Sequence, residues 1–298
     1  MKHDILAERA SSLRLHGLVA HLDEVRSDPA LAAYTERLLG WEETEFRDRR
    51  QRRLLGATKV GELEPVQGFD WTWPKKIPRD LIEDLFGLDF LKQKTNVVFL
   101  GSSGLGKTML AKNLAHAAAR ADHEALFVQA ADLLDDLQSE AVRSGVEKSL
   151  RRYAKPRLLV IDEVGYLSYD TRHADLLLRV IQKRHRVAST VVTTNRPFSE
   201  WREMFPNAAS VVALVDRLTE NCELVQIEGP SYRTHTATLR REARDAVYSG
   251  QSDHPFRSFR PERSDVISSH DPAAATVSIR ATPVRRIDSP LSSIRMAV

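Results

Sequence analysis

The chain has 298 residues, of which 42% are hydrophobic and 29% charged, as in an ordinary soluble globular protein. Its single cysteine, Cys222, cannot form an intrachain disulfide, so we expect a reducing, cytoplasmic setting. The side chain is more typical of a small buried residue that fills space than of a catalytic thiol. The net charge is only +3, but the sequence pI of about 9.0 is basic, which is a weak indication of an anionic partner. The absence of an apolar run of about eighteen residues argues against a membrane partner.

Residues 1–65 are predicted to form a helical domain that contacts a partner or DNA. The apolar positions of its first helix share one face: Leu18, Leu22 and Val25. That helix should end at Asp28-Pro29, because the residue before a proline avoids the helical conformation. A second helix follows, with an interruption expected at Gly40-Trp41.

A dense arginine run, residues 47–53, belongs to this second helix. Most charge runs are solvated helix faces. With a nucleotide-binding motif downstream, contact with the phosphates of double-stranded DNA is the alternative, and the sequence does not separate the two. The candidate contacts are Arg49, Arg50, Arg52 and Arg53.

Residues 66–80 are predicted to be a linker, because prolines and glycines are frequent there. Phe69, Trp71 and Trp73 lie inside this linker. An aromatic cluster in such a place usually anchors one domain against the next, and base stacking is the less favoured alternative.

The segment Gly101–Thr108 has the sequence G-S-S-G-L-G-K-T, which fits the phosphate-binding pattern G-x-x-x-x-G-K-[ST]. An apolar strand, 96–100, precedes it and an Ala- and Leu-rich helix, 109–120, follows, so the loop delivers the chain onto a helix N-terminus that favours anions. We therefore predict that the whole loop binds ATP, that Lys107 faces the β- and γ-phosphates, and that the Thr108 hydroxyl binds Mg²⁺. The predicted nucleotide contacts within the loop are Gly101, Ser102, Ser103, Gly104, Leu105, Gly106, Lys107 and Thr108.

From about residue 79 the pattern alternates strands with helices, which predicts an α/β domain, residues 81–248, with a five-stranded parallel sheet between helices. The strand candidates share apolar, largely β-branched sequences: 96–100, 125–129, 158–161, 190–194 and 224–227. Two helices, 132–140 and 146–153, are expected between the second and third strands. The second is basic, and Lys148, Arg151 and Arg152 are further candidate DNA contacts.

Two acids, Asp162 and Glu163, follow the apolar strand 158–161. Ligands bind beyond the carboxyl ends of the strands in an open α/β sheet, so both acids are predicted to lie beside the phosphate loop. Asp162 then serves as a Mg²⁺ ligand, and Glu163 activates the attacking water.

A polar amide, Asn195, ends the β-branched strand 190–194. If this strand neighbours 158–161, the amide could orient water against the γ-phosphate. An asparagine in an ordinary turn before Pro197 is an equally good interpretation.

Beyond residue 248 serine and proline become frequent and periodicity disappears, so residues 249–298 are predicted to be a disordered tail.

Four stretches taken together resemble the IstB-type ATPases: G-S-S-G-L-G-K-T, L-L-V-I-D-E-V-G-Y-L, V-V-T-T-N-R-P-F-S-E-W and V-D-R-L-T-E-N-C. These are transposition helper proteins encoded beside an insertion-sequence transposase, and they are AAA+ ATPases of the initiator clade, similar to the helicase loader DnaC. The resemblance covers about residues 10 to 240, and the second and third stretches are its most specific parts.

The resemblance implies further roles. Asn195 takes the sensor-1 position, Arg217 takes the arginine-finger position that reaches a neighbouring subunit's nucleotide, and Arg233 takes a position near the sensor-2 arginine. From the residues alone, Arg217 would be an ordinary partner of Asp216 or Glu220. The paired helices 132–153 resemble the insertion that lines DNA in this clade.

We therefore expect a Mg²⁺-dependent ATPase that forms a homo-oligomer on double-stranded DNA when ATP is bound and assists a cognate transposase. A DnaC-like loader of a replicative helicase is the nearest alternative. A DNA-binding scaffold that does not hydrolyse ATP is an alternative of another class, against which Asp162, Glu163 and Asn195 argue.

Overall fold

The computed structural model describes residues 4–143, 145–166, 169–206 and 208–249. The predicted tail, 249–298, lies outside the described residues except for Ser249, which ends the last helix. Among the helices of the described part, none is long and apolar enough to cross a membrane.

Five parallel strands form one sheet in the order β2-β3-β4-β1-β5. The strands are β1 (Asn96–Leu100), β2 (Ala125–Gln129), β3 (Leu158–Val164), β4 (Ser189–Thr194) and β5 (Cys222–Gln226). All five predicted strands are confirmed, with ends displaced by up to three residues. The half-buried Cys222 begins β5 and packs against the core, and burial raises the pKa of its thiol to about 12, which fits the predicted filler role.

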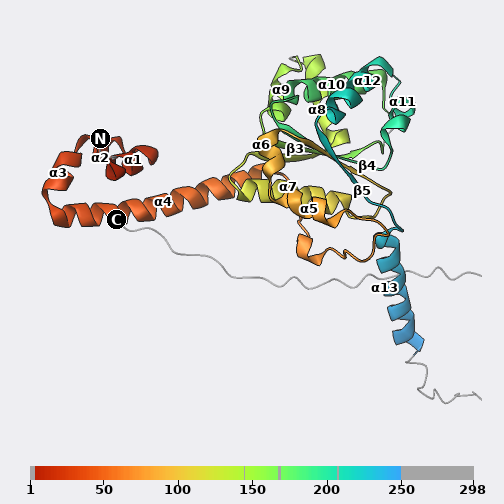
Figure 1. Ribbon diagram of the computed structural model, residues 1–298, viewed down its shortest axis with the longest axis horizontal. Coiled ribbons are helices and arrows are strands. Elements are labelled where there is room, and N and C mark those ends of the chain that lie inside the picture. Colours follow the sequence, from red (N-terminus) through yellow and green to blue (C-terminus); the bar gives the residue numbers. More distant parts are fainter. Residues whose placement is uncertain (1–3, 144, 167–168, 207, 250–298) are drawn as a thin grey trace, which may run out of the picture. The chain divides into compact units, whose positions relative to one another are not determined.

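Helices cover both faces of the sheet (Figure 1). One face carries α5 (Arg79–Phe86), α6 (Asp89–Gln93) and α7 (Lys107–Arg120). The other carries α8 (Ala130–Arg143), α9 (Glu147–Ala154), α10 (Thr171–Arg184), α11 (Trp201–Met204) and α12 (Ala208–Thr219). This confirms the predicted α/β class with a parallel sheet between helices.

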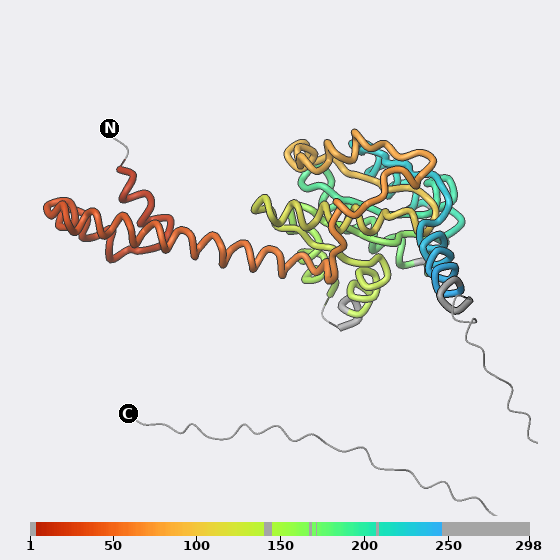
Figure 2. The backbone as a smooth tube through the Cα atoms, turned by 90° about the horizontal axis from the view of Figure 1, so that it is seen from below, coloured from red at the N-terminus to blue at the C-terminus, as the bar shows by residue number. Residues whose placement is uncertain are grey.

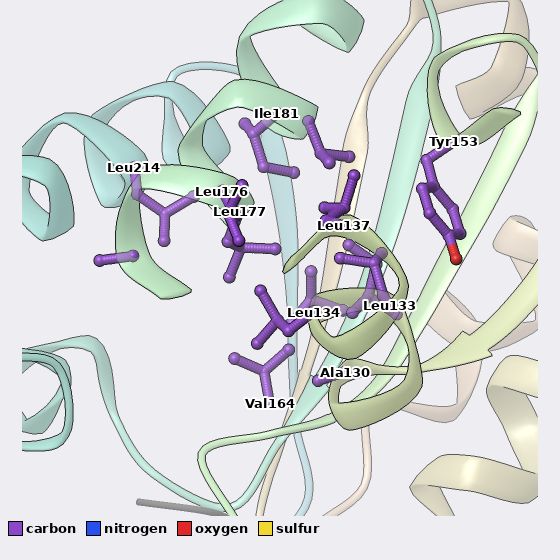
Figure 3. Close-up of a cluster of buried hydrophobic side chains, with 14 of the residues drawn as sticks. Ala130, Leu133, Leu134, Leu137, Tyr153, Val164, Leu176, Leu177, Ile181 and Leu214 are labelled. Carbon is purple, nitrogen blue, oxygen red and sulfur yellow. The ribbon is translucent and has the colours of Figure 1, made fainter. Parts of the chain in front are cut away.

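Each central strand contributes alternate side chains to two separate cores, as the two-residue period of a strand requires. In β3, Leu158 and Val160 pack towards α7, whereas Leu159 and Ile161 pack towards α8 and α10. Figure 3 shows the second core, where leucines of α8 meet Leu176, Leu177 and Ile181 of α10 and Leu214 of α12. These cores fix the strand ends that carry the predicted site.

The N-terminal region is helical, as predicted, but its helices differ from the expectation in two places. The predicted first helix is divided into α2 (His16–Ala20) and α3 (Leu22–Ser27), after α1 (Ile5–Ser12). The second, α4 (Pro29–Ala57), begins as expected at Pro29, where the Asp28 carboxylate accepts hydrogen bonds from two backbone N–H groups.

The interruption expected at Gly40-Trp41 is wrong, because α4 continues through it (Figure 2). Glycine costs a helix interior about 1 kcal/mol relative to alanine. Here the guanidinium of Arg9 approaches Gly40 and makes two hydrogen bonds to the Glu43 carboxylate, one turn further on. This tertiary contact across the glycine offsets its low helix propensity.

The predicted linker contains a short 3₁₀ helix, Val66–Gly68, and a turn before α5. The last helix, α13 (Tyr232–Ser249), follows β5 after a second short loop. An isolated bridge between Lys76 and Glu228 ties the predicted linker to the segment that leads into α13. Both segments thereby reach the carboxyl edge of β1, where the phosphate-binding loop begins.

Candidate nucleotide-binding site

The loop between β1 and α7 is held open by glycines at positions where no side chain fits. Gly104 and Gly106 have φ angles of +79° and +85°, a region that favours glycine. A Cβ atom on Gly104 would lie 2.2 Å from the Ser231 hydroxyl, and one on Gly106 would lie 2.4 Å from the Phe69 ring. At these two positions the loop therefore exposes only its backbone, against which Ser231 and Phe69 pack from segments distant in the sequence.

Lys107 is buried at the first position of α7, and its ammonium donates a hydrogen bond of 2.8 Å to the Ser102 carbonyl. The pKa of its ammonium is lowered to about 8, mainly by burial and also by the Arg233 charge, against the opposing effect of the Asp162 carboxylate. The N–H groups of the first turn of α7 have no carbonyl partner within the helix. An anion at this point would satisfy those groups and the buried cation together.

A hydroxyl network joins the loop to the two acids of β3. The hydroxyls of Thr108 and Thr193 donate to the same oxygen of Asp162, at 3.1 and 2.5 Å. The Thr193 hydroxyl also accepts a bond of 2.9 Å from the backbone N–H of Glu163. Burial raises the pKa of Asp162, and the two hydroxyls, together with Lys107, oppose that rise. Thr193 is thus an organising residue that sequence analysis missed.

These oxygen atoms fit the chemistry of a magnesium site. Mg²⁺ prefers oxygen ligands and is usually held by one or two protein groups together with phosphates and water. Thr108 and Asp162 supply one hydroxyl and one carboxylate beside the buried ammonium of Lys107. Among the described residues no group of three or more His, Cys, Asp or Glu side chains could hold a metal by itself. A metal here would therefore depend on the nucleotide's own phosphates.

Glu163 and Asn195 lie at the carboxyl ends of β3 and β4, which are neighbours in the sheet; this is the condition on which the sequence analysis places Asn195 beside the acids. Glu163 is half-buried and lines the cavity beside the loop. Asn195 follows β4, which pairs with β3 as far as Val164 and Thr194. Its side-chain oxygen is buried and has no hydrogen-bond partner among the described residues. A buried amide oxygen of this kind favours a ligand or water as its partner over the ordinary-turn interpretation.

Arg217 lies on α12 and does not line its own chain's cavity. It donates to the Ala213 carbonyl of its own helix at 3.2 Å. Of the two ion-pair partners considered for it, Glu220 contacts His185 and Arg186 instead. Arg217 has no described ion pair that would explain it as an ordinary surface residue, and its role in a neighbouring subunit stays a prediction.

The cavity beside the loop has a volume of about 200 Å³ and is walled by segments that no local motif marks. The predicted linker contributes Phe69, Asp70 and Trp73, and the loop after β3 contributes Tyr166, whose hydroxyl lies 2.9 Å from that of Ser103. The beginning of α13 contributes Tyr232 and Arg233. The linker aromatics therefore anchor this wall, as their preferred interpretation predicts.

Two contacts hold the linker over the loop. The buried amide of Asn113, on α7, donates to the Glu64 carbonyl at 2.8 Å and accepts from the Val66 N–H at 3.2 Å. The Trp73 ring stacks on His235 of α13 at 3.9 Å, and its N–H donates to the Pro230 carbonyl. The linker, α7 and α13 thus enclose one space, large enough for part of a nucleotide.

The predicted DNA contacts lie on α4 and α9, and most of them face acids. Arg49 and Arg52 approach Glu45, Arg50 pairs with Asp122, and Arg152 pairs with Asp136. Arg53 and Lys148 are exposed and have no ion pair among the described residues. The exposed Arg151 lies close enough to Glu147 to add to the effect of Lys183 and Arg179, which lower the pKa of that carboxyl. Their contact with DNA stays a prediction.

The chain is similar to known proteins over most of its length. The family model of IstB-like ATP binding proteins matches residues 8–240. An ATP-binding protein of insertion sequence IS232 from Bacillus thuringiensis subsp. berliner is 34% identical over 74% of this chain and 90% of its own length. An ATP-binding protein of insertion sequence IS21 from Pseudomonas aeruginosa is 32% identical over 75% of this chain and 86% of its own length.

Among solved structures, the DnaC helicase loader is similar at 21% identity and a TM-score of 0.45, over 59% of this chain and 99% of that one. DnaI is similar at 18% identity and the same TM-score of 0.45, over 59% of this chain and 93% of that one. The resemblance that the sequence motifs predict is confirmed by the family match.

Proposed function

Because this chain belongs to the family of IstB-like ATP binding proteins, with an ATP-binding AAA+ role, we propose that it hydrolyses ATP. We propose further that bound ATP lets it assemble on double-stranded DNA, where it assists an insertion-sequence transposase. The observation that carries the enzymatic part is the cluster of Lys107, Thr108 and Asp162 beside a cavity that Glu163 also lines. Each is a residue type that phosphoryl transfer requires in that place.

The residues have separate tasks in this proposal. Lys107 leaves the Ser102 carbonyl and binds the β- and γ-phosphates, while the loop N–H groups bind the remaining phosphate oxygens. Thr108 and Asp162 hold Mg²⁺, which when bound neutralises charge on the phosphates. Glu163 accepts the proton of the attacking water, and Asn195 orients that water through its unpartnered oxygen.

A second cation for the transition state is proposed to come from Arg217 of an adjacent subunit. Arg217 does not line its own cavity, and an arginine supplied by another chain contributes roughly 10³ to 10⁵ in rate in related NTPases. Bound ATP then favours the oligomer by giving this arginine a partner, and hydrolysis favours release. We further propose that α8 and α9 contact the DNA, as the related insertion does in the initiator clade.

The test compares ATP binding with ATP turnover in three variants. Lys107→Ala should weaken nucleotide binding, whereas Glu163→Gln should bind ATP normally and lose turnover by about 10² to 10⁴, the usual contribution of a general base. Glu83→Gln, which changes an exposed glutamate paired with Arg79, is the matched control and should behave like wild type. Unchanged hydrolysis in Glu163→Gln would remove that residue from the mechanism.

The same assays separate the alternatives. A wild-type protein that binds DNA and ATP without any turnover would be a scaffold and not an ATPase. A DnaC-like loader would share the ATPase properties, and it would be distinguished by binding a replicative helicase in place of a transposase. A transposase reading frame directly beside this one would favour the transposition helper.

A further inference from the structure

The surface of α13 carries a row of arginines that the predicted DNA contacts do not include. Arg233, Arg240 and Arg244 are separated by seven and four residues, so at 100° per residue they lie within about 20° of a common line along the helix. We call these three residues the α13 arginine row. At 1.5 Å per residue the row is about 16 Å long.

The acids of the same helix lie away from this row. By the same count, Glu242 is on the opposite side of α13 and Asp245 is about 120° away from Arg233. All three arginines are exposed, and no ion pair is recorded for any of them within the described part of the chain. Most of the predicted DNA contacts, in contrast, already face acids, as with Arg49, Arg50 and Arg152.

We propose that Arg240 and Arg244 of the α13 arginine row bind the phosphate backbone of duplex DNA, while Arg233 faces the nucleotide site; the proposal rests on the DNA binding proposed above. Duplex DNA carries one charge per about 1.7 Å of its axis, so a row of this length faces many phosphates. Arginines without an acid on their own helix face lose no existing partner when they bind phosphate. Contacts to phosphates carry no sequence information, so we expect this binding to depend on charge and not on the DNA sequence.

The row also joins this surface to the nucleotide site. Arg233, its first member, lines the cavity beside the phosphate-binding loop. The N–H of Tyr232, which begins α13, donates to the Gly104 carbonyl at 2.9 Å. Phosphates of DNA along the helix and phosphates of a nucleotide at its start therefore act on one rigid element. DNA binding through the row should raise ATP turnover.

The experiment removes two row members that are outside the nucleotide site, in Arg240→Gln/Arg244→Gln. The matched control removes the same charge from two exposed lysines that face acids and lie outside α8 and α9, in Lys76→Gln/Lys92→Gln. Affinity for a fluorescent 30-base-pair duplex (about three turns) is measured from 0.05 to 0.3 M salt. ATP turnover is measured with and without the duplex.

Two lost phosphate contacts should flatten the slope of log affinity against log salt by about 2, and lower the affinity at 0.15 M salt roughly 30-fold. Turnover without DNA should be unchanged, and its stimulation by DNA should fall. The lysine control should match wild type, and Arg240→Lys/Arg244→Lys should keep most of the affinity because it keeps the charge.

Several results would overturn the proposal. If wild type binds no duplex, the DNA-binding part of the proposed function fails and the row's role fails with it. If wild type binds and the arginine variant keeps its slope, the row alone is refuted. If Lys148→Gln/Arg151→Gln loses the whole salt dependence while the row variant keeps all of it, the DNA binding is assigned to α9 and not to the row. Loss of binding only to phosphatidylglycerol vesicles would assign the row to a lipid surface.

Discussion

Replacing Thr193 with valine should damage the site while leaving its shape almost unchanged. Valine fills nearly the same volume, but it removes a buried hydroxyl that donates to Asp162 and accepts from the Glu163 N–H. A hydrogen bond to a charged group contributes about 1.5 to 3 kcal/mol, and a buried N–H left without an acceptor costs about 1 to 3 kcal/mol. We expect the free energy of unfolding to fall by about 3 to 5 kcal/mol.

The catalytic effect should exceed what the lost stability explains. Both acids depend on Thr193 for their positions, and a displacement of about 1 Å of a reacting group can cost 10²-fold in rate. We therefore expect kcat at saturating Mg²⁺ and ATP to fall by about 10²-fold, measured at a temperature where urea unfolding shows the variant to be folded. Thr193→Ser, which keeps the hydroxyl, is the control and should stay close to wild type in both measurements. A valine variant with wild-type kcat and unfolding free energy would refute this account of Thr193.

Two further predictions concern arginines. Arg217→Ala and Lys107→Ala should each be nearly inactive. A mixture of the two should partly recover ATPase activity, because some interfaces would combine an intact loop with an intact arginine. Mixed oligomers that form without any recovery would refute the action of Arg217 in a neighbouring subunit. Arg184 is buried without a carboxylate, and its guanidinium donates to carbonyls of Tyr153, Ala154 and Pro156. Arg184→Met should lower the unfolding free energy by about 3 to 5 kcal/mol by leaving these carbonyls unpaired, and a thermal unfolding curve like that of wild type would contradict this.

Much of the sheet and the phosphate loop could be predicted from the sequence because local patterns determine them. The strand 158–161 and the loop 101–108 are marked by residue types that few other structures require at those spacings. The position of Asn195 at the end of a strand also follows from the sequence, but its place beside the acids depends on strand order, which the sequence does not determine. The β4–β3 pairing that confirms it depends on tertiary structure, which is why the sequence left its role open.

The cavity wall could not be predicted, because its parts are joined only by the fold. Trp73 and His235 are more than 160 residues apart and yet stack on each other. Thr193 was missed for a related reason: in a β-branched strand its hydroxyl looks like one more buried side chain, and only the register of β4 against β3 brings it to Asp162. The interruption expected at Gly40 rests on the low helix propensity of glycine, which the contact between Arg9 and Glu43 offsets.

The consecutive acids Asp162 and Glu163 pose a geometric problem that the backbone resolves. In a regular strand adjacent side chains point to opposite faces, so two neighbouring acids could not serve one site. The β3–β4 register shifts between Ile161 and Val164, and Glu163 has a φ angle of +61°. Such a bulge with a left-handed residue turns a side chain towards a new direction, at a cost of about 1 to 2 kcal/mol for a residue other than glycine. The Thr193 hydroxyl accepts the N–H that this turn removes from the regular ladder. Backbone strain of this kind clusters at active sites, which supports the proposal that Glu163 activates water.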